Sequence, residues 1–359
     1  MRTHRVFIVC LAALAVLAVG ICSADAQYFK DKTITILCGF SAGGGTDTAA
    51  RLLAKHYGKY IPGNPNVIVK NMTGGGGMNV RNFMYERAKP DGLTLCFMPV
   101  SVQSQLLEEP GVRFDYGKFS IVGPLLGPPV VVYGRTDIVA GGLKESKDIV
   151  KAKEIKFAGH RPSSWLDLLT LPSLDLLGVK YTYIPGYQGS PKMSAAVQRG
   201  EANISATSLA GYRTIEPVLG KDNLGRALWY YPIKDAKGDF VRNPDAGDIP
   251  SFVDVYKQVN GEPSGWKWEA FEFWFDQPWS VLRNLYGPPN VEPAVVEELR
   301  KAFNAMIESP DLIADQMKIF GFAHKPISVD QIESAMRNLK KTDPKIIQYW
   351  KDWVAEKSK

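Results

Sequence analysis

A glycine-rich segment at residues 39–47 (GFSAGGGTD) is the clearest candidate for chemistry in this chain. It lies between an apolar run at 33–38, a predicted strand, and an amphipathic run at 47–60, a predicted helix. A turn from strand into helix gathers backbone N–H groups at the positive end of the helix dipole, and glycine lets a ligand approach that backbone closely. The segment therefore predicts an anion-binding site.

A second glycine loop at residues 71–77 (NMTGGGG) follows the apolar run 67–69. Helical patterns follow both loops, at 47–60 and at 78–88. Two such loops on successive strand–helix units are expected to direct two sets of backbone N–H donors at one negatively charged group.

Three known glycine motifs are candidates for residues 39–47. A dinucleotide fingerprint (GxGxxG) fits in no register, and a phosphate-binding P-loop requires lysine where Gly45 stands. Residues 39–43 do fit GxSxG, which makes Ser41 a candidate esterase nucleophile. However, this motif follows the first strand, and the distant His160 and His324 have no evident carboxylate partner. An esterase stays an alternative, and no metal or cofactor is predicted.

The N-terminal residues have the pattern of a secretory signal. Arg2 and Arg5 precede an apolar run at 6–21, and Ala24-Asp25-Ala26 forms a small-x-small cleavage site. We expect a signal peptide at 1–26, cleavage after Ala26 and release into the periplasm. The net charge of +6 is spread along the chain, without the basic runs that bind nucleic acid. Cys38 and Cys96 each end an apolar run, which favours buried free thiols over a disulfide.

Strand-like and helix-like runs alternate through most of the chain, which predicts an α/β protein with parallel strands. Two segments rich in proline, glycine or polar residues, at 123–129 and 234–250, are predicted to cross between domains. Residues 27–127 and 241–359 would then form domain 1, and residues 128–240 an inserted domain 2. A cleft between two such domains is a natural site for a small ligand.

Four segments together resemble the periplasmic solute-binding proteins of the tripartite tricarboxylate transporter family, the TctC or Bug proteins. They lie at 36–47 (ILCGFSAGGGTD), 50–54 (ARLLA), 69–76 (VKNMTGGG) and 88–95 (AKPDGLTL). The family usually has proline where this chain has Ser41. The resemblance implies a type II periplasmic-binding-protein fold, with two α/β domains and a ligand cleft between them.

The resemblance also implies a binding site. In the family both glycine loops hold a carboxylate through backbone N–H groups and bridging waters. Asp47 is expected either to cap its helix or to contact the ligand. Arg161 is expected either to pair with a second carboxylate of the ligand or to lie in solvent, with Ser163 as the N-cap of the next helix. The candidate ligand-binding residues are Phe40, Ser41, Ala42, Gly43, Gly44, Asp47, Asn71, Thr73, Gly75, Gly76, Ser101, His160, Arg161, Ser163, Ser164, Tyr187, Thr207 and Trp279.

We therefore expect a monomeric, non-catalytic receptor that binds a small organic carboxylate. Its partner, as the resemblance implies, is a membrane transporter of the tripartite tricarboxylate type. A sensor that presents the same ligand to a membrane kinase is the alternative.

Overall fold

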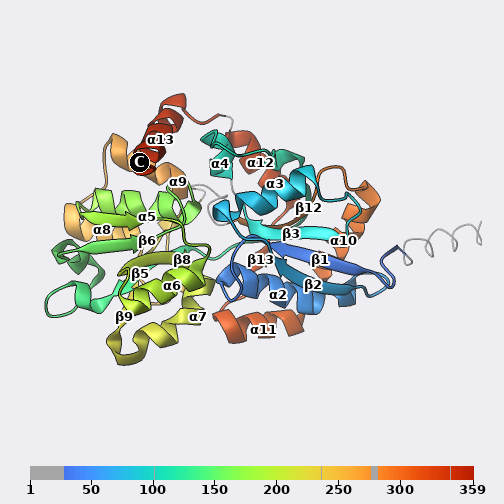
Figure 1. Ribbon diagram of the computed structural model, residues 1–359, viewed down its shortest axis with the longest axis horizontal. Coiled ribbons are helices and arrows are strands. Elements are labelled where there is room, and N and C mark those ends of the chain that lie inside the picture. The colour runs from blue at the N-terminus through green and yellow to red at the C-terminus, as the bar shows by residue number, and fades with distance from the viewer. Residues whose placement is uncertain (1–27, 101, 236, 276–281, 340) are drawn as a thin grey trace, which may run out of the picture.

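Two α/β lobes lie side by side in the computed structural model of the chain (Figure 1). The structure describes residues 28–100, 102–235, 237–275, 282–339 and 341–359. The predicted signal peptide and the candidates Ser101 and Trp279 lie outside the described residues. Every helix in the described part of the chain is too short or too polar to cross a bilayer.

The first lobe is built on a six-stranded sheet with the order β13-β4-β12-β3-β1-β2. Strands β2, β1 and β3 are parallel, whereas β12 runs antiparallel to both β3 and β4. Because parallel strands end at the same edge, the loops that follow β1 and β2 emerge together. The strands are β1 (Thr33–Cys38), β2 (Asn66–Asn71), β3 (Thr94–Pro99), β4 (Ser120–Leu126), β12 (Leu282–Gly287) and β13 (Lys325–Pro326).

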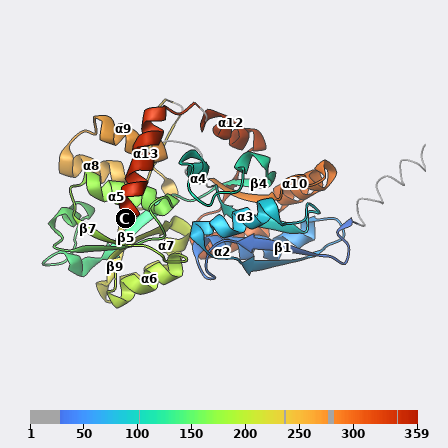
Figure 2. The ribbon, with the colours of Figure 1, turned by 45° about the horizontal axis from the view of Figure 1, so that its top comes forward.

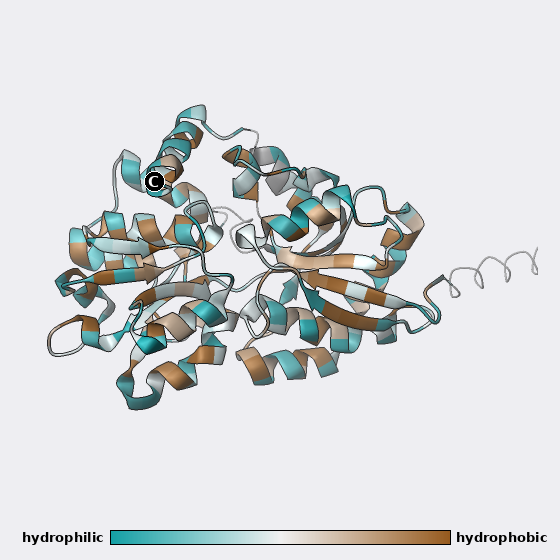
Figure 3. Cartoon of the chain, viewed as in Figure 1, coloured by the Kyte–Doolittle hydropathy of each residue, from teal (hydrophilic) through white to brown (hydrophobic). Residues whose placement is uncertain are grey.

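Alternating side chains bury both faces of the first sheet. On β3, Leu95 and Phe97 pack with α2 and α10, while Cys96 and Met98 pack with α3 on the other face. Brown and teal bands alternate along the surface helices in Figure 3, as expected for helices with one buried face. The helices of this lobe are α2 (Gly45–Tyr57), α3 (Met78–Glu86), α4 (Val102–Leu106), α10 (Pro293–Ile307), α11 (Pro310–Phe320) and α12 (Val329–Leu339).

The second lobe repeats this arrangement on a five-stranded sheet with the order β7-β6-β8-β5-β9. Strands β7, β6 and β8 are parallel, and β5 is antiparallel to β8. Its strands are β5 (Val130–Arg135), β6 (Ile155–Ala158), β7 (Tyr181–Ile184), β8 (Ile204–Ser208) and β9 (Gly225–Tyr230), and its helices include α5 (Trp165–Leu176), α6 (Ser190–Arg199) and α7 (Leu209–Gly220).

Three later helices pack against the second lobe. They are α8 (Phe252–Asn260), α9 (Trp266–Phe275) and α13 (Pro344–Lys357). Their aromatic rings share one core with β5, β6 and β9, and Trp350 Nε1 donates to the Ala270 carbonyl at 2.9 Å. Figure 2 shows α13 over this lobe and α12 over the other. The predicted domain boundaries stay a prediction, and these contacts join part of 241–359 to the second sheet.

The sequence located most of the regular elements, with two kinds of error. Residues 123–126, predicted as part of a crossing, belong to β4, because β12 pairs with them and the Phe303 ring packs over Gly123. Residues 127–129 connect β4 to β5. Strand β12 and helix α8 were not predicted. The segment 234–250 includes the last residue of the short strand β10 (Ile233–Lys234) and all of β11 (Phe240–Val241).

We predict that Gly123→Ala destabilises the protein by about 1–3 kcal/mol, since overpacking a core costs that much. A Cβ at this position would overlap the Phe303 ring. Gly220→Ala is the control, because no atom lies within 4 Å of the Cβ it would add. Urea denaturation of both variants measures the difference. Equal stability of Gly123→Ala and the wild type would show that Phe303 does not constrain β4.

Candidate functional site

A cavity of about 90 Å³ lies between the two lobes, with room for several water-sized groups. Both sheets contribute to its wall at the carboxyl ends of their parallel strands, the place where open α/β sheets bind ligands. The residues that line it are Phe40, Gly44, Gly45, Thr46, Gly76, Arg81, Pro99, Val100, Gln103, Gly127, Pro128, Val130, His160, Ser164, Trp165, Leu166, Ser190, Thr207, Ser208 and Arg283.

Four helices begin at this cavity. The first turn of α2 lines it with Gly45 and Thr46, and α5, α6 and α7 contribute Trp165, Ser190 and the N-cap Ser208. The first N–H groups of a helix have no partner within the helix, and its N-terminus carries about half a positive charge. The wall is therefore electropositive even before charged side chains are counted.

The charged side chains of the wall have one sign. Arg81 and Arg283 line the cavity and are buried, at 2% and 4% exposure. Among the described residues that line it, none is Asp or Glu. Burying cations without a carboxylate is costly, so this cavity is suited to an anionic ligand.

Asp47 holds the first glycine loop in place. Its carboxylate accepts from the Gly43 N–H at 2.9 Å, from Arg51 Nε at 2.9 Å and from Asn71 Nδ2 at 2.7 Å. Asn71 Nδ2 also donates to the Phe40 carbonyl, which ties the second loop to the first. Burial alone would raise the pKa of Asp47, but these hydrogen bonds outweigh it and lower the pKa. Gly44 is the N-cap of α2, and Asp47 accepts from Gly43, the residue before it, so Asp47 ties the loop to the start of the helix. Contact of Asp47 with a ligand stays a prediction.

The second glycine loop has a backbone that favours glycine. Gly74–Gly77 all have positive φ, between 56° and 121°, a conformation that other residues rarely adopt. A Cβ on Gly76 would lie 2.8 Å from Arg161 Nε of the other lobe. Arg81 fixes the loop by donating from Nη1 to the Gly76 carbonyl at 3.4 Å and from Nη2 to the Pro99 carbonyl at 2.9 Å.

The loop after β6 resembles the first glycine loop in its spacing and in its place between a strand and a helix. Residues 159–167 run from Gly to Asp over the same spacing as residues 39–47, and each loop leads from a strand into a helix. Asp167 Oδ2 accepts from the backbone N–H groups of His160 and Arg161, both at 2.8 Å. Burial raises the pKa of Asp167, and these hydrogen bonds oppose that rise.

His160 meets the first loop across the cavity. Its ring stacks on Phe40 with the centroids 5.7 Å apart, and both side chains line the cavity. His160 Nδ1 lies 2.6 Å from the Tyr187 carbonyl oxygen. A carbonyl only accepts, so Nδ1 carries the proton and Nε2 is left for another partner.

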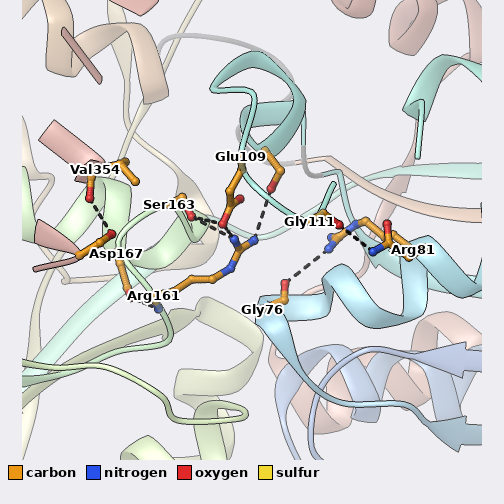
Figure 4. Close-up of polar contacts among 11 residues, drawn as sticks. Gly76, Arg81, Glu109, Gly111, Arg161, Ser163, Asp167 and Val354 are labelled. Carbon is orange, nitrogen blue, oxygen red and sulfur yellow. Dashed lines mark hydrogen bonds and ion pairs between the residues drawn. The ribbon is translucent and has the colours of Figure 1, made fainter. Parts of the chain in front are cut away.

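Arg161 is bound to a carboxylate of the other lobe. It forms an ion pair with Glu109, and Ser163 Oγ donates to the same carboxylate at 2.6 Å. Figure 4 shows the Arg161 and Glu109 side chains pointing toward each other with Ser163 beside them. Burial, and then the nearby charge of Arg81, lower the pKa of Arg161 to about 10. The solvated alternative for Arg161 is therefore wrong, and its guanidinium does not line the cavity.

Ser41 also makes a contact between the lobes. Its hydroxyl donates to the Gln188 carbonyl at 2.9 Å, and its backbone N–H donates to the same oxygen at 3.3 Å. These contacts give Ser41 a structural partner rather than a general base. Within the described residues, no cluster of three His, Cys, Asp or Glu side chains is suited to a metal ion. Cys38 and Cys96 are buried free thiols.

The predicted site residues fall into two groups. Those that line the cavity are Phe40, Gly44, Gly76, His160, Ser164 and Thr207. The remaining described ones are Ser41, Ala42, Gly43, Asp47, Asn71, Thr73, Gly75, Arg161, Ser163 and Tyr187, which the cavity wall does not include. Several of these position the loops, as Asp47 and Asn71 do. Contact of either group with a ligand stays a prediction.

Sequence reasoning missed the two arginines of the cavity. Arg81 lies three residues before Met84 on the buried face of α3, and such a cation on an apolar face was an available signal. Arg283 lies on β12, a strand that was not predicted. Gln103 and Trp165 were missed for a similar reason, since only the tertiary fold brings them to the wall.

Comparison with known proteins supports the architecture. No family model matches the chain. A relative from Agrobacterium vitis, "UPF0065 protein in the TAR-I ttuE-ttuC' intergenic region", is 30% identical over 45% of this chain and 46% of its own length. The match thus spans about half of that curated relative.

Two solved structures match along nearly the whole chain. The periplasmic binding protein BugD is 19% identical with a TM-score of 0.66, over 91% of this chain and 98% of BugD. The chain resembles the Bug solute-binding proteins. MatC from Rhodopseudomonas palustris with bound malate is also 19% identical, with a TM-score of 0.65 over 90% and 99% of the two chains. The predicted resemblance and the predicted α/β periplasmic-binding-protein fold are confirmed.

We predict that Asp47→Asn destabilises the protein by about 1–3 kcal/mol at pH 7, because it weakens charge-assisted hydrogen bonds of a buried group. Asp47 has a lowered pKa, so its stabilising effect is complete above the unfolded-state pKa of about 4 and disappears as the pH falls through the folded-state pKa. The difference in the free energy of unfolding between Asp47→Asn and the wild type should therefore become smaller below about pH 4. Denaturant unfolding at a series of pH values measures it.

Asp137→Asn is the matched control, because Asp137 makes an exposed ion pair with Arg135. Asp137→Asn should lower the free energy of unfolding by no more than about 1 kcal/mol. A loss for Asp47→Asn no larger than that of the control would contradict the structural role assigned to Asp47.

Proposed function

We propose that this protein is a periplasmic receptor that binds a small organic carboxylate between its lobes and delivers it to a membrane transporter of the tripartite tricarboxylate type. One observation carries the proposal. The described wall of the cavity combines four helix N-termini with two buried arginines and no acidic side chain. Such a wall stabilises an anion and repels cations.

The cavity offers donors that a carboxylate would satisfy. The N–H groups of Gly45 and Thr46 lie in the first turn of α2, where no helix carbonyl reaches them. Ser164 Oγ and Trp165 Nε1 are buried without a hydrogen-bond partner among the described residues, and both residues line the cavity. Gln103 also lines the cavity, and its Oε1 is a buried acceptor without a partner among the described residues. Such an acceptor suits a ligand that also has a hydroxyl group.

The contacts between the lobes fit a receptor that closes around its ligand. Phe40 stacks on His160, Arg161 pairs with Glu109, and Ser41 donates to Gln188, each contact joining one lobe to the other. Closure around a ligand is the usual movement of two-lobed binding proteins. The malate in MatC and the name of BugD as a periplasmic binding protein support both the ligand class and the location.

Calorimetry with malate, adipate and their monocarboxylate counterparts tests this function on the mature wild-type chain. We expect at least one carboxylate to bind with a 1:1 stoichiometry. At 100 times its Kd such a ligand should add about 2.7 kcal/mol of stability, visible as a higher melting temperature. A cationic compound of similar size, such as putrescine, should produce no shift.

Two variants separate a receptor from an esterase. Ser41→Ala should retain binding, because the serine hydroxyl donates to a carbonyl of the protein. Gly76→Val should abolish binding, because φ is +60° there and a Cβ would meet Arg161. Retained affinity in Gly76→Val would contradict the role of the second glycine loop in binding. Ester hydrolysis that disappears in Ser41→Ala would contradict the receptor function.

A further inference from the structure

Arg283 is a buried cation of the cavity that no described carboxylate neutralises. Strand β12 places it opposite Pro99 of β3 and Leu125 of β4, near the edge where β1 and β3 end. The residue is 4% exposed and lines the cavity. Burial lowers the pKa of Arg283 to about 10, so the guanidinium is still charged at neutral pH.

The polar partner that Arg283 has within the described residues is a histidine. Arg283 Nη1 lies 3.4 Å from His324 Nε2. His324 Nδ1 in turn lies 3.3 Å from Gln316 Oε1, which also accepts from the His324 backbone N–H at 2.7 Å. An amide oxygen only accepts, so Nδ1 carries the proton and Nε2 offers its lone pair to Arg283.

His324 accordingly holds Arg283 without cancelling its charge. Burial, and then the charge of Arg283, lower the pKa of His324 to about 3, so the ring is neutral. Arg51 and Arg161 differ, because each pairs with a carboxylate, Asp47 and Glu109 respectively. A carboxylate in place of His324 would have neutralised Arg283, and its charge would then be unavailable to a ligand.

Balancing the positive charge of the cavity requires more than one negative group on the ligand. Arg81 is the second buried guanidinium of the wall, and its described partners are the carbonyl oxygens of Gly76 and Pro99. Carbonyls orient a guanidinium and leave its net charge intact. Helix N-termini satisfy one carboxylate with neutral N–H groups, so the two arginines remain to be balanced.

We propose that Arg283 is a ligand-binding residue that makes this site select acids with two ionised groups over acids with one, and that His324 and Gln316 position it. The inference rests on the proposed function, since it assigns the selectivity of the same cavity. Arg283 supplies a fixed, forked pair of donors for the second acid group, a geometry that lysine does not reproduce.

Matched ligand pairs measure this selectivity. Malate and 3-hydroxybutyrate share a four-carbon chain with a hydroxyl group, and adipate and hexanoate share a six-carbon chain, so each pair differs by one carboxylate. The wild type should bind the dianion of a pair at least about 30-fold more tightly, the lower range for a buried charge pair. Wild-type affinities that are equal within each pair would overturn the proposal without any variant.

Arg283→Met removes the charge and keeps most of the volume. It should weaken dianion binding by about 30-fold or more and monoanion binding by less than about 3-fold, so the selectivity collapses. Arg283→Lys keeps the charge and should retain an intermediate preference, which keeps the test valid if the Met variant does not fold. Arg199→Met, an exposed position paired with Glu201, is the control and should change neither affinity.

The ratio of dianion to monoanion affinity tests whether His324 positions Arg283. His324→Leu removes the acceptor for Arg283, and His324→Gln retains a neutral one. The Leu variant should lower the ratio of dianion to monoanion affinity, and the Gln variant should restore part of it. A structural defect alone would weaken both ligands of a pair equally and leave the ratio unchanged, which would overturn the role of His324.

The outcomes separate this inference from the function on which it rests. If the wild type binds none of the four acids, the proposed function fails for these ligands and the inference fails with it. If the wild type binds with dianion preference and Arg283→Met retains that preference, the receptor function stands and the role of Arg283 is overturned. Loss of preference in Arg283→Met with normal circular dichroism supports both.

Discussion

Positive charge that is buried between the lobes without a matching carboxylate is the constraint on which this structure depends. Helices α2, α5, α6 and α7 all begin at the cavity, and Arg81 and Arg283 add full charges to its wall. Their arrangement would be unfavourable in a cavity that stayed empty and dry, because buried ions lose their hydration. Water or an anion must compensate them, and an anion compensates both the charge and the open N–H donors.

Closely similar loops in the two lobes carry the backbone N–H donors of the site. In each lobe the first parallel strand leads into a segment that begins with glycine and ends, eight positions later, with an aspartate buried in the first turn of a helix. Asp47 and Asp167 both accept backbone N–H groups of their own loops. Neither aspartate lines the cavity, so they hold the loops in place without adding negative charge to its wall. The second residues of the loops, Phe40 and His160, stack on each other.

The sequence was most informative where short-range signals were strong. Strands at 33–38, 155–158 and 181–184 agree with the structure, because apolar runs bounded by glycine or polar residues mark them clearly. Both glycine loops were found from composition and position alone. Strand β12 was not predicted because it is defined by its pairing with β3 and β4, which lie far away in the sequence.

The same reason explains what was missed at the site. Arg283 reaches the cavity only through β12, and the pairing of Arg161 with Glu109 depends on how the two lobes meet. A turn rich in small residues can be recognised locally, whereas the partner of a charged side chain is a property of the tertiary fold. Backbone donors were therefore predictable here, and side-chain charges were not.

The most direct test of the account is an anomalous difference map from crystals of the mature protein grown in bromide, which reports anion sites without knowledge of the natural ligand. The account predicts a bromide peak inside the cavity, near the first turn of α2 and the guanidinium of Arg283. Bromide bound only on the outer surface, with the cavity holding no anion, would contradict it.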